Sequence, residues 1–439
     1  MTATIEQTGL TPTGPRFGLR ELIRMRTQPI TRNDLMRERY GEVIRLKVFG
    51  VEMFPCYGLD AAEQVLINRD RAFAAGPAWG HFIGPFFRRG LLLLDFEEHL
   101  HHRRILQAAF ANQALRSYHE VMLPHIKRGM AHWGEVPNPR MNELFKQLTL
   151  DLALETFVGI DLPQKEQDRL NKAFINAVRA GTSVIRANVP FTPWARGLTA
   201  RKELEDFFYK NIPAKREHGG DDLFAQLCLA KSDDGDEFSD EDIVNHMIFT
   251  LMAAHDTSTI TMTAMAYYLA KHPEWQEKAR AEAIANDTDY DTNQTLDVLT
   301  RVMKEAIRLC SPVPSIPRMA LRDTTVNGYL IKKGSFVTVS PYYNHRDRTV
   351  WTNPDEFDPD RFSDERREDQ AHRMAFEGFG GGVHKCIGMH FARTQVRAIF
   401  QELLRTYKWS VPDDYTWPLD LVALPFPRDR LPVTLERLS

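Results

Sequence analysis

The sequence has little cysteine, no long apolar run and almost no excess of charge, and each of these limits the class of protein. Its four cysteines are Cys56, Cys228, Cys310 and Cys386. They lie far apart without a C-x-x-C pair, which disfavours a disulfide-stapled secreted domain. No apolar run reaches the roughly 18 residues that a membrane span needs, and the first residues lack a signal-peptide core. We therefore expect a cytoplasmic protein with no transmembrane anchor.

Charge balance and composition predict an ordinary folded protein. The chain has 56 basic and 59 acidic side chains, and its formal net charge of −3 gives no overall attraction to nucleic acid or to an anionic membrane. Any recognition of a charged partner is therefore expected to be local. The hydrophobic fraction of 43% and the charged fraction of 26% are typical of a globular protein.

The chain divides into a short tail and one long folded part. Residues 1–30 carry Thr, Pro and Gly without periodicity, which predicts an N-terminal tail packed on the surface. No repeat or low-complexity linker divides residues 31–439, so we predict a single domain there. Residues 43–57 are rich in β-branched and aromatic side chains and are broken near residues 49–50, which predicts a hairpin. Asp60 is predicted to cap the short helix that follows.

Helical patterns dominate the rest of the chain. From about Phe96 onward, apolar residues recur at three- and four-residue spacing, which predicts a mainly α fold with small β-sheets (α+β). The longest such stretch runs from about residue 239 to residue 270, and Ser239 with Asp242 forms a capping box at its start. Its apolar character on nearly all sides predicts a helix through the interior. The polar residues 255–259 interrupt it, and buried polar groups are costly unless they are satisfied.

A glycine-rich loop near the C-terminus carries a single cysteine. Three consecutive glycines, residues 380–382, allow a tight turn and a close approach to a flat ligand. Cys386 lies just before an amphipathic helix, where amide N–H groups and the helix dipole favour a thiolate over a thiol. Such a sulfur suits a ferric haem, and Gly388 permits close packing beneath the ring. The alternative is a buried structural cysteine beside a glycine turn.

The spacing in this loop matches a known family. Phe379, Gly382, Cys386 and Gly388 reproduce the pattern F-x-x-G-x-x-x-C-x-G, and here the sequence resembles the cytochrome P-450 superfamily, in its bacterial-type soluble form. The resemblance implies a triangular prism of helices around a buried haem b, with the Cys386 thiolate as the axial iron ligand. His384 occupies a position where the family commonly has a basic residue facing a haem propionate.

A second motif follows in the family's order. Glu305 and Arg308 form an E-x-x-R pair one helical turn apart, although such pairs are common on solvated helix faces. The segments PVPSIPRMA and PDEFDPDRF follow this pair in the chain. The resemblance then implies that Glu305 and Arg308 both contact Arg361, and that these three residues have a structural role. Arg318 matches the family's second propionate-pairing position, and its planar fork suits a carboxylate.

Histidines cluster in the segment after residue 96. His99 and Arg103 form H-x-x-x-R, so both leave one helical face and could reach one haem propionate. The alternative is that His99, His101 and His102 bind a metal ion, but no acidic or cysteine partner lies at a suitable spacing. We expect His101 and His102 to be surface residues.

The middle of the long helix resembles the family's oxygen-activation pattern, [A/G]-G-x-[D/E]-T. The resemblance implies that Asp256 and Thr257 organise water and deliver protons to bound oxygen. Ala254 stands where the family usually has glycine, which leaves the depth of the oxygen groove open. The alternative is that the Thr257 hydroxyl simply bonds back to the preceding helical turn.

The resemblance implies a monooxygenase that inserts one atom of O2, its co-substrate, into a lipophilic molecule of steroid, terpenoid or fatty acyl type. Electrons are expected from an external ferredoxin with its reductase, or from a flavodoxin, because no flavin- or dinucleotide-binding segment is visible. Lys385, Arg393 and Arg397, with His384, are predicted to form the positive docking surface, unless they are solvated charges without a partner.

Other functions stay open. A haem-thiolate peroxygenase or isomerase often lacks the acid and alcohol of Asp256 and Thr257, and a haem-binding sensor would usually carry an output domain. Sterol demethylases typically have His-Thr at this position. Apolar residues at family substrate positions predict a lipophilic pocket made of Trp79, Phe82, Ile83, Phe86, Leu251, Met252, Ala253, Val313, Ile316 and Leu424.

Overall fold

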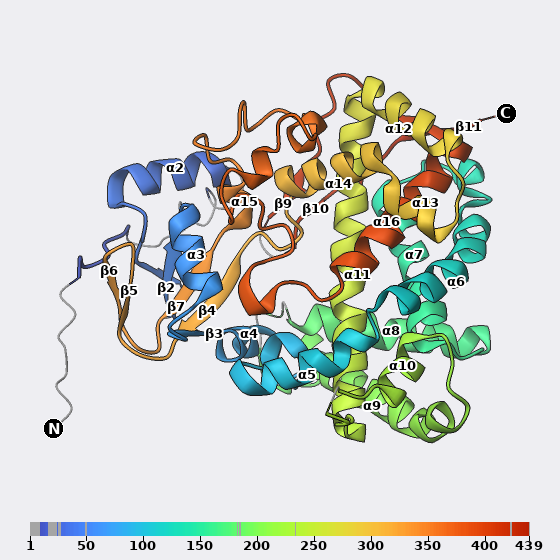
Figure 1. Ribbon diagram of the computed structural model, residues 1–439, viewed down its shortest axis with the longest axis horizontal. Coiled ribbons are helices and arrows are strands. Elements are labelled where there is room, and N and C mark those ends of the chain that lie inside the picture. The colour runs from blue at the N-terminus through green and yellow to red at the C-terminus, as the bar shows by residue number, and fades with distance from the viewer. Residues whose placement is uncertain are drawn as a thin grey trace. The chain divides into compact units, whose positions relative to one another are not determined.

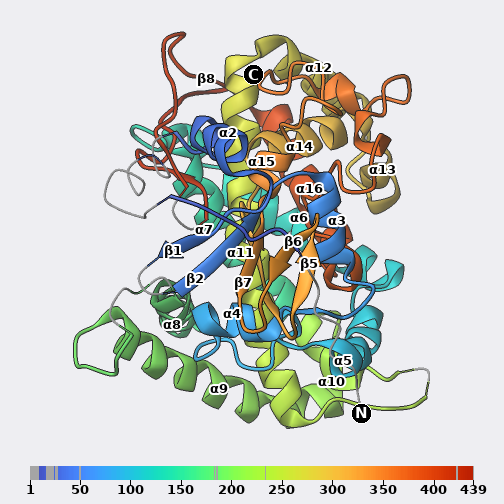
Figure 2. The ribbon, with the colours of Figure 1, turned by 90° about the vertical axis from the view of Figure 1, so that its left-hand side faces the viewer.

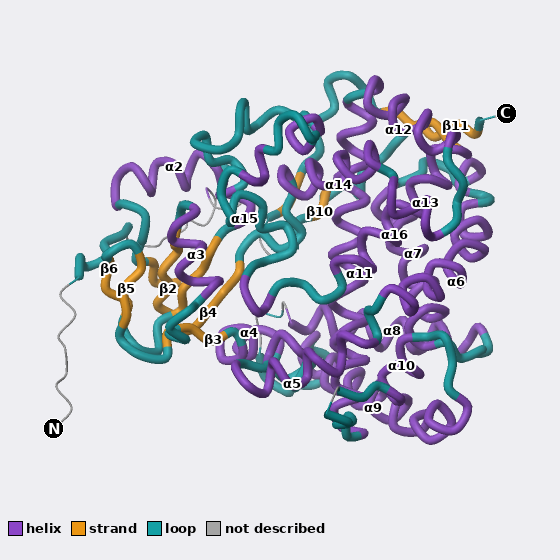
Figure 3. The backbone as a smooth tube through the Cα atoms, viewed as in Figure 1, coloured by secondary structure: helices purple, strands orange, loops and turns teal. Residues whose placement is uncertain are grey.

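The computed structural model describes residues 9–15, 24, 28–48, 51–181, 183, 186–232, 234–421 and 424–438. Helices make up most of this chain and the strands are short (Figure 3), which confirms the mainly α fold with small sheets. The chain forms two compact units. Unit 1 comprises Met1–His81, Lys304–Cys386 and Leu419–Pro425, and unit 2 comprises Phe82–Met303, Ile387–Pro418 and Phe426–Ser439. The single domain over residues 31–439 stays a prediction, and most of the expected tail lies outside the described residues.

Unit 1 is built on a five-stranded sheet in the order β1-β2-β7-β4-β3. Figure 2 shows the first three of these strands, β1, β2 and β7. β1 and β2 pair antiparallel, which confirms the predicted hairpin, and residues 49–50 lie outside the described residues. β2 also pairs in parallel with β7, from much later in the chain. The elements of unit 1 are α2 (Pro29–Tyr40), β1 (Leu46–Val48), β2 (Val51–Cys56), α3 (Leu59–Ile67), β3 (Phe73–Ala74), β4 (Ile316–Ala320), β5 (Thr324–Val326), β6 (Tyr329–Ile331), β7 (Phe336–Val339), α15 (Pro341–Asn344), η4 (Pro359–Phe362), η5 (Glu368–Gln370), η6 (Gly382–His384) and β9 (Leu419–Asp420).

The start of α3 differs from the prediction. The helix is capped by Gly58, not by Asp60, which lies in the first helical turn. Gly58 has a φ of 93°, a conformation that glycine adopts without steric cost, and its N–H donates to Asn344 Oδ1 at 3.1 Å. Asp60 still suits the helix start through its charge, because a carboxylate there interacts favourably with the helix dipole.

Unit 2 is helical, and α11 (Asp240–Lys271) runs through the middle of it (Figure 1). Most of its residues are buried, and α7 and α9 pack against it, which confirms the predicted interior helix. Ser239 Oγ accepts from Asp242 N at 3.1 Å, so the predicted cap is confirmed. The other elements of unit 2 are η1 (Leu91–Leu93), α5 (Phe96–Ala108), α6 (Asn112–Met130), η2 (Trp133–Glu135), α7 (Met141–Ala153), the π-turn η3 (Leu154–Val158), α8 (Gln164–Gly181), α9 (Pro193–His218), α10 (Leu223–Leu229), α12 (Pro273–Ala285), α13 (Tyr290–Thr295), α16 (Met389–Thr406), β8 (Tyr407–Ser410), β10 (Phe426–Pro427) and β11 (Thr434–Arg437).

Two helices, α4 (Gly76–Ile83) and α14 (Asp297–Leu309), begin in one unit and end in the other. α14 carries the E-x-x-R motif near its C-terminal end, within unit 1. Within the described ranges, none of the helices has the length and apolar character that crossing a bilayer requires.

Candidate active site

The loop before Cys386 is held in a tight shape by its own backbone. Gly380 N donates to Glu377 O at 2.8 Å, and Cys386 N donates to Phe379 O at 2.9 Å. Gly380 and Gly382 have φ angles of 72° and 64°, a region that side chains rarely adopt. A Cβ atom on Gly382 would lie only 2.1 Å from the carbonyl oxygen of Leu66. The glycines are therefore required for this loop conformation.

The four cysteines, all among the described residues, fall into two groups. Cys56, Cys228 and Cys310 are buried, whereas Cys386 is exposed. Burial raises the pKa of the Cys228 and Cys310 thiols to about 12 in each case and also raises that of Cys56. These three therefore stay protonated thiols at neutral pH. Cys386, three residues before α16, is the cysteine that an external group can reach.

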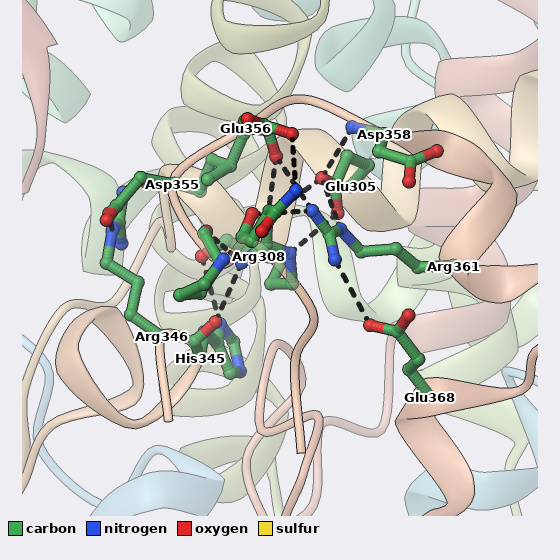
Figure 4. Close-up of polar contacts among 12 residues, drawn as sticks. Glu305, Arg308, His345, Arg346, Asp355, Glu356, Asp358, Arg361 and Glu368 are labelled. Carbon is green, nitrogen blue, oxygen red and sulfur yellow. Dashed lines mark hydrogen bonds and ion pairs between the residues drawn. The ribbon is translucent and has the colours of Figure 1, made fainter. Parts of the chain in front are cut away.

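The structure brings Glu305, Arg308 and Arg361 together in unit 1 (Figure 4). Glu305 accepts hydrogen bonds from Arg308 Nε at 2.6 Å, Arg308 Nη2 at 2.8 Å and Arg361 Nε at 3.3 Å. The amide of Asp358 donates a further bond at 2.8 Å. None of the three side chains is more than 1% exposed, so solvent does not reach the two guanidinium groups. Glu305 pairs with both of them, and Arg361 Nη1 also lies 3.2 Å from Oε2 of Glu368.

A buried acid that the sequence reasoning did not single out stands at the start of the cysteine loop. Glu377 is 1% exposed, and its Oε1 accepts from Asn344 Nδ2 at 3.1 Å. No protein partner meets its Oε2 among the described residues. Burial raises the pKa of Glu377 to about 8, against the smaller lowering by the Asn344 hydrogen bond. A carboxyl group within an apolar, glycine-rich stretch is the one sequence signal that could have identified it.

Glu377→Gln is expected to remove a pH dependence of stability. Folding raises the pKa of Glu377 from 4.5 to about 8, so its contribution is fully present below pH 4.5 and is lost as the pH rises through about 8. Between these values the wild-type free energy of unfolding should fall by about 1.4 kcal/mol per pH unit relative to the variant, since glutamine cannot ionise. Urea unfolding of both proteins across this window measures the difference, and parallel curves would contradict the prediction.

His99 and Arg103, the predicted propionate partners, both lie on α5 in unit 2. His99 is 1% exposed, and Arg103, one turn later, is half-buried. The surface location predicted for His102 is wrong. Its side chain is buried, and its Nδ1 lies 2.8 Å from Nε2 of His246 in α11. Burial lowers the pKa of both rings, that of His246 to about 3, so both rings are neutral and one of them donates its N–H to the other. His101 lies 3.7 Å from Asp236.

The other predicted haem contacts are distributed over both units. In unit 1, Arg318 is 3% exposed on β4, where its Nη1 donates to Pro317 O at 2.9 Å, and His384 is half-buried at the end of η6. Phe379 is half-buried in the cysteine loop. In unit 2, Gly388 is the N-cap residue of α16.

Asp256 in α11 has two basic neighbours. Its Oδ1 lies 3.1 Å from Nδ1 of His255 and 3.5 Å from Nζ of Lys146 in α7. Burial raises the pKa of Asp256, but the His255 and Lys146 contacts outweigh it and hold the pKa below its ordinary value. Asp256 is therefore an anion at neutral pH. Lys146 was missed by the sequence reasoning, because nothing in the linear sequence signals this contact.

Thr257 bonds back to the preceding turn, which was the alternative considered for it. Its Oγ1 donates to the carbonyl oxygen of Ala253 at 2.7 Å. The hydroxyl proton is thereby engaged, but the lone pairs of Oγ1 can still accept a hydrogen bond. A back-bonded threonine can thus orient a water or another donor beside the helix.

The predicted pocket residues lie in several elements. Trp79, Phe82 and Ile83 belong to the short helix α4. Phe86 is fully buried with its ring 4.9 Å from that of Trp194. Within unit 2, Leu251 lines a cavity of about 20 Å³ together with Phe174, His255 and others. Of the remaining residues, Ala253 is exposed, Ile316 is buried, and Met252, Val313 and Leu424 are partly buried.

The predicted basic docking surface is partly wrong. Arg397 is only 5% exposed, and its Nη2 donates to Gln294 Oε1 at 2.9 Å while its Nη1 lies 3.3 Å from Thr300 Oγ1. Burial lowers the pKa of Arg397 to about 10. Its guanidinium is a structural contact of α16 and is not available to a partner. Lys385 is exposed and Arg393 is half-buried.

A family model and similar known proteins indicate the same family for this chain. Residues 9–429 match the family model named Cytochrome P450. A protein described as cytochrome P450 136 from Mycobacterium tuberculosis is 45% identical over 388 residues, which cover 86% of this chain and 78% of that protein. Lanosterol 14-alpha demethylase from Mus musculus is 26% identical over 86% of this chain and 77% of its own.

Solved structures share the fold. A retinoic acid-bound cyanobacterial CYP120A1 superposes with a TM-score of 0.86 at 24% identity, covering 98% of this chain and all of that chain. A cytochrome P450DA heme domain gives a TM-score of 0.85 at 26% identity, covering 98% and 97%. The family model and the 45% identical relative extend over most of the sequence, and the chain therefore belongs to the cytochrome P450 family and is a cytochrome P450 monooxygenase.

Proposed function

We propose that the protein binds haem b through the thiolate of Cys386 and inserts one oxygen atom of O2 into a lipophilic substrate. The observation that carries this proposal is the exposed Cys386 in a loop whose Gly380 and Gly382 adopt left-handed conformations. The residues present fit the group, because Cys386 is exposed, the glycines before it add no side chains to the loop, and the other three cysteines are buried thiols. When bound, the haem supplies the activation of O2.

Four basic side chains are the proposed partners of the haem propionates. Arg318, His384, His99 and Arg103 can donate to the two propionates, because guanidinium and imidazole groups form charge-assisted bonds with carboxylates. Phe379, Gly382 and Gly388 are the proposed packing positions around the ring and the thiolate.

Asp256 and Thr257 are the proposed proton-delivering residues. The Lys146 ammonium group can donate one of its protons to Asp256 Oδ1, 3.5 Å away, and because Lys146 is 39% exposed, the resulting amine can take up a proton from solvent. Thr257 Oγ1 then orients the accepting water, since its own proton is held by Ala253 O. This arrangement keeps the carboxylate ionised and ready to accept a proton.

Asp256→Asn is expected to lower the turnover number by about 10²-fold, because an amide cannot relay a proton as a carboxylate does. Substrate affinity should change little, and a larger share of the electrons consumed should appear as hydrogen peroxide. Steady-state kinetics with peroxide quantification in ordinary and deuterated water measures both effects. Asp256→Glu is the matched control that keeps the acid. If the asparagine variant turns over at the wild-type rate, Asp256 has no role in proton delivery.

The proposed substrate class is lipophilic, of steroid, terpenoid or fatty acyl type. The aromatic and aliphatic residues at the predicted pocket positions support this class, and mammalian relatives named for lanosterol add support for a steroid. The Asp256-Thr257 pair replaces the His-Thr typical of sterol demethylases, which favours simple hydroxylation over demethylation.

Two measurements test this function together. A screen of steroids, terpenoids and fatty acids by haem difference spectroscopy finds molecules that displace the iron-bound water. Turnover of a hit under ¹⁸O2, with a ferredoxin and its reductase, should place one labelled oxygen atom in the product. A product unlabelled under ¹⁸O2, formed with hydrogen peroxide but not with reductant and O2, would instead establish a peroxygenase.

Electron donation is proposed to involve the exposed Lys385 of the cysteine loop, which suits an acidic ferredoxin or flavodoxin. Lys385→Glu should slow reduction by a ferredoxin several-fold at low salt, with the difference disappearing at high salt as charges are screened. Stopped-flow reduction measures the rate. Lys202→Glu, a 75% exposed lysine on α9, is the charge-matched control. Equal rates for wild type and the Lys385 variant at low salt exclude this docking surface.

A further inference from the structure

We infer that His345 is a positioning residue for the loop that carries Cys386, an inference that rests on the proposed haem-thiolate function. His345 directly follows α15 and is completely buried in unit 1. Its two ring nitrogens contact two different segments of the chain. One is the C-terminal end of α14 and the other is the first residue of the cysteine loop.

The contacts define a single tautomer of the ring. His345 Nε2 lies 2.8 Å from the amide nitrogen of Glu377, and because an amide N–H only donates, Nε2 is the acceptor. Nδ1 therefore carries the proton and donates to the carbonyl oxygen of Arg308 at 3.2 Å. Burial lowers the pKa of His345 to about 3, which agrees with a neutral ring. Each nitrogen thus has one fixed role.

Backbone hydrogen bonds connect Glu377, which His345 holds, to Cys386. Glu377 O accepts from Gly380 N, and Phe379 O accepts from Cys386 N. The His345 ring also stacks on Phe376, with centroids 5.2 Å apart and an interplanar angle of 10°. Because the sulfur is placed by this backbone, an unanchored Glu377 would let the Cys386 loop sample other conformations.

Asn344, the residue before His345, binds the side chain of Glu377. Its Nδ2 donates to Glu377 Oε1, while its Oδ1 accepts from Gly58 N. Asn344 therefore binds the carboxyl group of Glu377, and His345 binds its backbone amide. Two successive residues of one turn fix the start of the loop.

The other side of His345 is fixed by the trio described above (Figure 4). Arg308 Nη1 donates to the carbonyl oxygen of His345 at 2.8 Å, while the His345 ring donates to the carbonyl oxygen of Arg308. Arg308 in turn is paired with Glu305. His345 thus connects the buried ion-pair network to the thiolate loop, which gives the network a role in placing the sulfur.

The test compares His345→Phe with His119→Phe in the haem-loaded protein. Phenylalanine keeps an aromatic ring against Phe376 but removes both hydrogen bonds. His119, on α6, is an equally buried histidine whose two ring nitrogens have no partner among the described residues, so it controls for general loss of a buried imidazole. Hydrogen–deuterium exchange over residues 377–386 and the Soret band of the reduced carbonyl complex are measured.

For His345→Phe we expect exchange in residues 377–386 to rise by about tenfold, the effect of losing one buried hydrogen bond. The share of the carbonyl complex with the red-shifted thiolate band should fall, and His119→Phe should change neither readout. His345→Gln, whose Oε1 can accept from Glu377 N, should partly restore the slow exchange and the thiolate band. This variant replaces His345→Phe in the test if the phenylalanine variant does not fold.

The possible outcomes distinguish a failure of the His345 positioning role from a failure of the proposed haem ligation by Cys386. A wild-type protein without the thiolate band overturns the proposed haem ligation, while the exchange measurement still reports on His345. A normal wild-type band with exchange and spectra unchanged in both His345 variants overturns the positioning role and leaves the function intact. Equal changes in the His345 and His119 variants also overturn it, since they would reflect general destabilisation.

Discussion

Replacing Cys386 with serine is expected to abolish the red-shifted Soret band of the reduced carbonyl complex and to reduce monooxygenase turnover below detection. A thiol has a pKa near 8.5 and becomes an anion readily beside a metal, whereas an aliphatic hydroxyl stays protonated at neutral pH. The variant therefore lacks the anionic sulfur whose electron density assists O–O cleavage. Serine is nearly the same size, so the loop held by Gly380 and Gly382 should keep its conformation.

Cys228→Ala is the matched control for that experiment. Cys228 is a buried thiol on α10 with a pKa raised to about 12, and its loss should leave the haem spectrum unchanged. Reduced carbonyl spectra and turnover with an electron donor are recorded for wild type and both variants, and thermal unfolding of each shows that the fold is retained. A thiolate-type spectrum in the Cys386 variant would assign the iron ligand to another residue.

The thiolate loop was accessible to sequence reasoning because its determinants are adjacent in the chain. Gly380, Gly382 and Cys386 act through backbone conformation and local hydrogen bonds, and both follow from short-range spacing. The long helix α11 was predictable for a similar reason, since periodicity and the cap at Ser239 are local properties.

Contacts between distant segments were not accessible in the same way. Lys146 meets Asp256 across two helices, and His345 meets Glu377 between two loops, and no spacing rule relates such positions. A single sequence specifies which residues can pair, but the partner depends on how elements pack. The trio of Glu305, Arg308 and Arg361 was anticipated only because a family pattern supplied the long-range pairing.

Burial of polar side chains was the other source of error. His102 and Arg397 were expected at the surface, although histidine is only intermediate in its tendency to be exposed, whereas arginine is mostly exposed. Both are buried because the packing supplies partners, namely the His246 ring for His102 and the Gln294 and Thr300 side chains for Arg397. Whether a polar residue at the edge of a helix face is covered depends on its neighbours, which periodicity does not reveal.

Glu305→Ala is expected to destabilise the fold by about 3–5 kcal/mol and to prevent stable haem incorporation. The variant leaves Arg308 and Arg361, at most 1% exposed, without the carboxylate that accepts three of their hydrogen bonds. Arg361 keeps its ion pair with Glu368 at 3.2 Å, but Arg308 is left with backbone carbonyl acceptors. An uncompensated charge in a buried site costs far more than the net contribution of the intact pair. The amide of Asp358 also loses its acceptor, which adds a buried unsatisfied donor.

Glu356→Ala provides the control from the same segment. Glu356 has an exposed side chain, and only its backbone carbonyl accepts from Arg308, so truncation should cost about 0.5 kcal/mol or less. Denaturant unfolding followed by fluorescence gives the free energies, and haem content per protein reports cofactor incorporation. Arg308 also reaches His345, so the Glu305 variant should show faster hydrogen exchange in residues 377–386 even where it folds. Equal stability of the two variants would mean that the Glu305 carboxylate is dispensable and that the carbonyl oxygens, with Glu368 beside Arg361, are enough to hold the two arginines.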